Sequence, residues 1–142
     1  MNVKQALKAK NKLVAEIKEC YRILQTQNSI EEGNPRRYSV KKKLEDIAEL
    51  TDELVQLKAR LHRANAPVYD KIFALAELKG MIKELKKVPT DEGKSSDRYS
   101  SIPSVKEVEL NVTDIDNSIS ILETQIEELQ NELDVHNATT NI

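Results

Sequence analysis

The sequence predicts an all-α protein: an elongated antiparallel four-helix bundle or coiled coil, with a short β segment before the last helix. Three observations lead to this fold class. Of the 142 residues, 32% are charged and 39% apolar, with three Gly, one Phe and no Trp. Such a composition is typical of long amphipathic helices. Apolar residues also recur at three- and four-residue spacing in four segments, and the last segment keeps a heptad pattern. We expect one helical domain over residues 1–142.

The first helix is predicted over residues 2–28. Its apolar stripe steps in fours and threes through Val3, Leu7, Val14, Ile17, Tyr21 and Leu24, with Lys10 as the one interruption and Ala6, Leu13 and Cys20 beside it. It ends before Glu31-Glu32-Gly33-Asn34-Pro35, where Gly and Pro mark a loop. Cys20 lies on the apolar flank of this helix, so we interpret it as a buried packing residue and not as a nucleophile. A single Cys in the chain agrees with a reducing compartment.

The second helix is predicted over residues 39–65, with Ser39 as its N-cap. Its apolar face contains Val40, Leu44, Ile47, Leu50, Leu54, Leu57, Leu61 and Ala64. Pro67 cannot donate the backbone hydrogen bond that a continuing helix needs, and it disfavours the helical conformation of Ala66. Asn65 is a residue that tolerates a left-handed helix end. These residues favour a tight αα-hairpin, and one kinked helix is the alternative.

The third helix is predicted over residues 67–87, with Pro67 at its first position. Val68, Ile72, Leu75, Leu78, Ile82 and Leu85 form its stripe, and it stops before Pro89. Gly80 within the helix costs about 1 kcal/mol relative to Ala. This glycine either marks the close approach of a neighbour or is simply tolerated.

Residues 88–112 form the one long irregular segment, a loop followed by a short strand. Val108, Leu110 and Val112 alternate with polar residues, which is strand periodicity. A lone strand leaves backbone groups unpaired. We therefore expect it to pair either with the preceding segment, residues 99–105, or with another subunit.

The fourth helix is predicted over residues 113–137, with Thr113 as N-cap. A seam with strict four-three spacing follows, which we call the α-helical seam and assign to self-association. It consists of Ile115, Ile119, Leu122, Ile126, Leu129 and Leu133. His136 extends the pattern, and we assign it a structural role because a cation suits a helix C-terminus. Residues 138–142 are expected to fray.

Charge is distributed unevenly, although the net charge is −2. Residues 1–43 contain eleven Lys or Arg and four Glu, whereas residues 107–142 contain nine acids and no Lys or Arg. The two ends should attract each other. The densest basic segment is a candidate for nucleic-acid or anion contact, through Arg36, Arg37, Lys41, Lys42 and Lys43. The acidic total and the scarcity of aromatic residues weigh against nucleic acid.

Five short motifs make the chain similar to a family of small bacterial helical proteins of unknown function, some of them labelled septicolysin. They are Glu32-Gly33-Asn34-Pro35, Arg63-Ala64-Asn65-Ala66, Asp97-Arg98-Tyr99-Ser100, Val112-Thr113-Asp114-Ile115 and Asn137-Ala138-Thr139-Thr140. The resemblance implies a helical bundle that assembles into a homo-oligomer, with no established activity. The family often has Asn-Trp near the C-terminus, whereas Ala138 follows Asn137 here. The label would imply a membrane-active toxin, but no secretory signal or long alternating hairpin is visible.

The sequence predicts no catalytic, cofactor-binding or metal site. Gly33, Gly80 and Gly93 are too far apart for a phosphate-binding loop, and His62 and His136 lack metal-ligand spacing. No apolar run is long enough to span a membrane, so we expect a cytoplasmic protein. The predicted function is therefore a non-enzymatic structural or protein-interaction role in a coiled-coil homo-oligomer. A nucleic-acid adaptor and a membrane-active toxin remain the alternatives.

Overall fold

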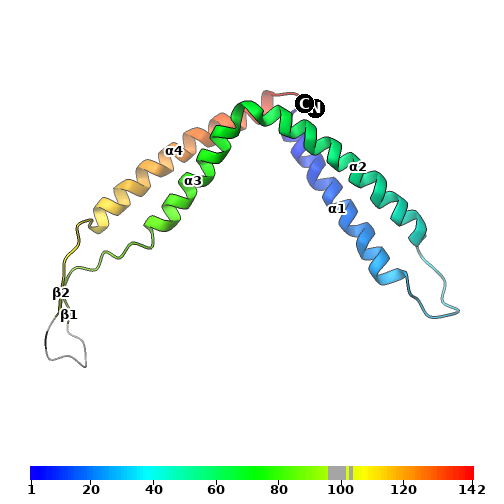
Figure 1. The fold of residues 1–142 in the computed structure, drawn as a ribbon, viewed down its shortest axis with the longest axis horizontal. Coiled ribbons are helices and arrows are strands. Elements are labelled where there is room, and N and C mark those ends of the chain that lie inside the picture. Colours follow the sequence, from blue (N-terminus) through cyan, green and yellow to red (C-terminus); the bar gives the residue numbers. More distant parts are fainter. Residues whose placement is uncertain (96–101, 103) are drawn as a thin grey trace. The chain divides into compact units, whose positions relative to one another are not determined.

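The computed structural model describes residues 1–95, 102 and 104–142 and is mostly helical. The described elements are α1 (Val3–Gln27), α2 (Val40–Asn65), the 3-10 turn η1 (Ala66–Val68), α3 (Tyr69–Leu85), β1 (Gly93–Ser95), β2 (Ser104–Lys106) and α4 (Val112–Thr139) (Figure 1). Where the sequence predicts one domain, the chain divides into two compact units. Unit 1 comprises Met1–Val68 and Asp134–Ile142, and unit 2 comprises Tyr69–Leu133.

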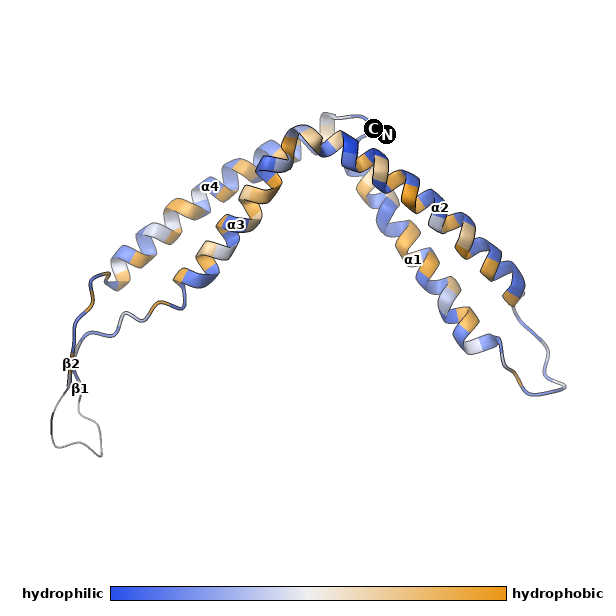
Figure 2. Ribbon diagram, viewed as in Figure 1, coloured by the Kyte–Doolittle hydropathy of each residue, from blue (hydrophilic) through white to orange (hydrophobic). Residues whose placement is uncertain are grey.

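Unit 1 is an antiparallel pair of helices, α1 and α2, lying side by side (Figure 1). Its buried cluster lies where the start of α1 meets the end of α2 and consists of Val3, Ala6, Leu57 and Leu61. Farther along the pair, Cys20 and Ile23 of α1 and Ile47 of α2 are also buried. Polar residues separate these apolar positions along each helix (Figure 2), as the predicted spacing requires. Cys20 is thus a packing residue, as predicted.

The ends of these two helices are capped by short polar contacts. Asn2 and Gln5 form a capping box at the start of α1, in which each side chain accepts a hydrogen bond from the other's backbone N–H. Ser39 Oγ accepts from Lys42 N at 3.2 Å, which confirms Ser39 as the N-cap of α2. Gly33 turns the intervening loop with φ +90°, a conformation that suits only glycine.

The predicted αα-hairpin loop at Asn65-Ala66-Pro67 is wrong in its local geometry. Asn65 is the last residue of α2 rather than a left-handed cap, and Ala66 is right-handed helical with φ −50° and ψ −41°. A 3-10 turn then leads directly into α3. Pro67 is compatible with this turn because its fixed φ is helical. The change from α to 3-10 hydrogen bonding therefore accommodates the missing N–H without a loop.

Unit 2 contains α3, the two strands and the main part of α4. Lys71 Nζ lies 2.9 Å from Glu132 Oε2, which joins the start of α3 to the far end of α4, and β1 pairs with β2 at the opposite end of the unit. The two helices are therefore antiparallel (Figure 1). Few of their Cα atoms come within 8 Å of each other, so this pair is looser than α1 with α2.

The strand predicted around Val108 and Leu110 is misplaced. The observed ribbon is antiparallel and pairs Gly93 with Lys106 and Ser95 with Ser104. Residues 107–111 form no strand, and Val112 already belongs to α4. The reason lies in Asn111, whose Oδ1 accepts from Asp114 N at 2.9 Å while Asp114 Oδ2 accepts from Asn111 N at 3.0 Å.

This reciprocal pair is a capping box, and it places the N-cap at Asn111, two residues before the predicted cap, Thr113. A helix that starts here includes Val112, the last apolar residue of the alternating pattern. The other two, Val108 and Leu110, then have no strand to pair with. The motif around Asp97 and Tyr99 lies outside the described residues.

Candidate functional site

The basic segment does not form a free cationic patch. Arg36 Nη1 donates to Gln27 O at 2.8 Å and Nη2 to Asn28 O at 3.0 Å. These carbonyls belong to the last turn of α1, where no intrahelical donor remains. The Arg36 guanidinium therefore caps a helix, and the residue with the best geometry for binding a phosphate is already engaged within the chain.

Two further bases of the segment are paired along α2. Lys42 Nζ lies 3.2 Å and Lys43 Nζ 3.9 Å from the Asp46 carboxylate. The hydrogen bond to Asp46, with the nearby carboxylate charge, raises the pKa of Lys42. Arg37 and Lys41 are exposed. Arg36, Lys42 and Lys43 therefore have acceptors within the chain, and anion contact through the five candidate residues stays a prediction.

The α-helical seam is covered within the chain. Ile115, Leu122 and Leu133 are buried, and Ile119, Ile126 and Leu129 are half-buried. The facing helix is α3, whose Ile72, Leu75, Leu78, Ile82 and Leu85 are also half-buried. Three residues of the seam are thus buried in the single chain, and the role of the seam in self-association stays a prediction.

The opposite side of α3 was not identified from the sequence. Tyr69, Phe73, Ala76 and Gly80 follow four-three-four spacing, and we call them the outer strip. Phe73 is 63% exposed, and its ring stacks on Tyr69 with centroids 5.7 Å apart and an interplanar angle of 16°. None of the residues of α3 is buried. The outer strip could have been predicted because α3 carries apolar residues on both sides (Figure 2). That pattern is typical of a helix that other elements cover on all sides.

The two ends of the described chain meet in unit 1 and form what we call the terminal clasp, Met1–Val3 with Thr140–Ile142 (Figure 1). Val3 N donates to Thr140 O at 2.9 Å, and Ile142 N donates to Met1 O at 3.1 Å. Arg60 of α2 donates to Ile142 O at 3.0 Å. The Ile142 side chain packs on the cluster that contains Val3 and Leu57.

Residues 138–142 therefore do not fray, contrary to prediction. The sequence ATTNI gives little sign of order by itself. Its order comes from the backbone of Met1–Val3 and from the apolar cluster, and both lie far away in sequence.

His136 and Asn65 join α4 to α2 beside the terminal clasp. His136 Nε2 lies 3.2 Å from Asn65 Oδ1, and Nδ1 lies 3.0 Å from Thr140 Oγ1. An amide oxygen can only accept, so Nε2 carries a proton. The predicted structural role of His136 agrees with these contacts. Asn65, expected to be a left-handed helix end, is the last right-handed residue of α2, and its amide positions the imidazole.

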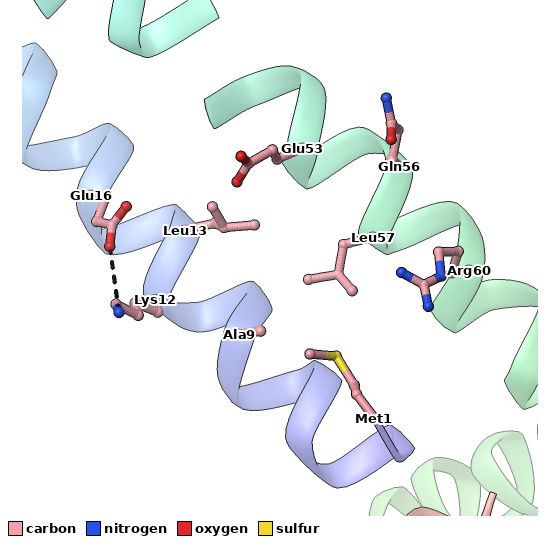
Figure 3. A pocket seen from close by; sticks show the side chains of 9 residues that line it. All are labelled: Met1, Ala9, Lys12, Leu13, Glu16, Glu53, Gln56, Leu57 and Arg60. Carbon is pink, nitrogen blue, oxygen red and sulfur yellow. Dashed lines mark ion pairs between the residues drawn. The ribbon is translucent and has the colours of Figure 1, made fainter. Parts of the chain in front are cut away.

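Shallow grooves run along the α1–α2 pair. One of them, about 490 Å³, is lined by Met1, Ala9, Lys12, Leu13, Glu16, Glu53, Gln56, Leu57 and Arg60 (Figure 3). Met1, Leu13 and Leu57 point between the helices, and Lys12 pairs with Glu16 at 4.0 Å. The groove is open and carries both signs of charge.

Within the described residues, no three His, Cys, Asp or Glu side chains gather closely enough to hold a metal ion. No helix in that part of the chain combines the length and apolar character needed to cross a membrane. No protein-family model, curated protein or solved structure matches the chain.

Proposed function

We propose that the protein is a non-enzymatic structural or protein-interaction component that assembles with further copies of itself. Its two antiparallel helix pairs would serve as rigid elements, and contact between helix pairs of different copies would complete helical bundles. The four-helix bundle expected from the sequence would then arise between two chains, each contributing two helices.

The observation that carries this proposal is the exposure of apolar residues on α3. Phe73 is 63% and Met81 50% exposed, and every residue of this helix retains some contact with solvent. Burying an exposed Phe side chain contributes about 1.5–3 kcal/mol. A second chain that covered α3 would therefore gain apolar burial that the single chain leaves unused.

Sedimentation equilibrium of the wild-type chain tests the proposal. Between about 1 and 200 μM, the expected mass rises to a multiple of the 16.2 kDa chain mass. A mass that stays at one chain over the whole range would overturn the proposal. The same samples, examined by circular dichroism, must keep a helical spectrum, so that a lack of association is not confused with unfolding.

A further inference from the structure

The outer strip of α3 has the spacing of a coiled-coil seam. The inner side of the helix faces α4, as shown by the pair of Lys71 with Glu132 at 2.9 Å and by the half-buried Leu75 and Leu78. On the outer side, Tyr69, Phe73, Ala76 and Gly80 recur at alternating four- and three-residue intervals. Knobs-into-holes packing against another helix needs this spacing. The strip covers about three turns, because Lys83 occupies the next position in the pattern.

Charged residues on the two flanks of the strip have opposite signs. One flank is acidic and consists of Asp70, Glu77 and Glu84, which are spaced seven residues apart. The other flank carries Lys79 and Lys86, with the same spacing. All five residues are exposed. An apolar seam with acids along one side and lysines along the other is the arrangement that sets partner orientation in coiled coils.

These flanks distinguish a parallel from an antiparallel pairing of two copies. When two identical helices pair in antiparallel, each flank faces the same flank of the partner, so acids would face acids and lysines would face lysines. When they pair in parallel, each flank faces the opposite one. Lys79 of each copy would then face Glu84 of the other, since flank residues about five positions apart meet in parallel coiled coils. Charge complementarity therefore selects a second copy in parallel orientation.

Gly80 is consistent with a close helix–helix approach. A Cβ added at Gly80 would meet no atom of its own chain within 4 Å, so packing within the chain does not require a glycine. Gly80 nevertheless costs the helix about 1 kcal/mol relative to Ala. Together with Ala76 it forms a small-residue notch one turn from Phe73, where the backbone of a second helix can approach. Within the single chain no neighbour approaches Gly80 closely, so close approach at this residue would come only from a second copy.

We propose that the outer strip of α3 is a homodimer interface, in which α3 of one copy packs in parallel against α3 of a second copy with reciprocal Lys79–Glu84 pairs. This inference rests on the proposed self-association and assigns it to one surface and one orientation. Each copy's α4 remains on the inner side of its own α3, so the two α3 helices lie between the two α4 helices.

A charge exchange tests the orientation. We expect Lys79→Glu and Glu84→Lys each to weaken dimerisation by about tenfold, because two attractive pairs become two repulsive ones. The double variant carrying both changes should recover to within about threefold of wild type. Glu123→Lys on the exposed side of α4 makes the same charge change as Glu84→Lys and should leave the dimer unchanged. Weakening in both single variants without recovery in the double variant would overturn the parallel pairing.

Disulfide cross-linking tests the same contact without relying on charge. In a Cys20→Ala background, Gly80→Cys should form a covalent dimer under mild oxidation, because parallel pairing places residue 80 beside its counterpart. Ser120→Cys, at an exposed position of α4, is the matched control and should stay uncross-linked. A wild-type chain that associates while Gly80→Cys fails to cross-link would overturn this interface and leave the proposed function standing. A wild-type chain that never associates would overturn both.

Discussion

Val3 and Val14 lie on the same predicted stripe of α1, but the structure gives them different surroundings. Val3 is fully buried beneath the terminal clasp, whereas Val14 is 40% exposed. Replacing Val3 with Ala removes two methyl groups from a closed site. The transfer term is about 0.8 kcal/mol for each buried carbon, or about 1.6 kcal/mol. A cavity term of up to about 1 kcal/mol adds to it. We therefore expect Val3→Ala to lower the free energy of unfolding by about 2 to 2.5 kcal/mol.

Val14→Ala is the matched control on the same helix. It loses less apolar burial, and the higher helix propensity of Ala returns about 0.5 kcal/mol. Its expected change in the free energy of unfolding is about 0.5 kcal/mol or less. Urea unfolding, followed by circular dichroism at one fixed protein concentration, measures both variants against wild type. A loss below about 0.5 kcal/mol for Val3→Ala, or equal losses for the two variants, would refute the clasp as the cause of burial at Val3.

Three further predictions concern single contacts. Arg36→Ala should lower the free energy of unfolding by about 1 kcal/mol and speed amide exchange at the end of α1, because Arg36 caps that helix. Arg37→Ala makes the same charge change and should have little effect on either measurement. Asn65→Ala should cost about 1 kcal/mol by removing the acceptor of His136 Nε2, and ring ¹⁵N shifts that are unchanged from wild type would contradict that contact. Finally, the hydrogen bond to Glu132 raises the pKa of Lys71. The stability that protonated Lys71 contributes to the folded state is therefore present below the unfolded pKa, near 10.4, and is lost as the pH rises through the folded pKa. NMR titration should find the Lys71 pKa lower in Glu132→Gln, and no difference would contradict the pair.

The sequence predicts the helices well because each has a strong local signal. Ser39 caps α2 as expected, and the apolar spacing of α4 identifies Ile115, Leu122 and Leu133, which are buried. In α1 only Val3 of the predicted stripe is buried, whereas Tyr21 is 47% exposed. The errors occur where two local signals compete. At Asn65-Ala66-Pro67 a helix-breaking proline is absorbed by a 3-10 turn, and at Asn111 a capping box overrides an alternating apolar pattern.

The candidate surfaces are harder to predict because they depend on which elements meet. The apolar spacing of the α4 seam is visible in the sequence, and only the structure shows that Ile115, Leu122 and Leu133 are buried within the single chain. The terminal clasp joins residues at opposite ends of the sequence, so no local pattern indicates it. The outer strip of α3 could have been found from its heptad spacing. That pattern is obscured because the inner stripe of the same helix is also apolar, which blurs the contrast between its faces.

The most direct test of the account compares the solution mass of wild type with that of Phe73→Glu. Phe73 is 63% exposed in the single chain, so Phe73→Glu should keep the helical circular dichroism spectrum. Loss of the Tyr69 stacking and the acidic neighbours Asp70 and Glu77 should lower the free energy of unfolding of the monomer by about 1 kcal/mol or less. In a dimer, the substitution would place two like charges in the centre of the apolar strip. We predict that wild type sediments as a dimer at about 100 μM and that Phe73→Glu sediments as a monomer. Equal masses for the two proteins would contradict the assignment of α3 as the interface.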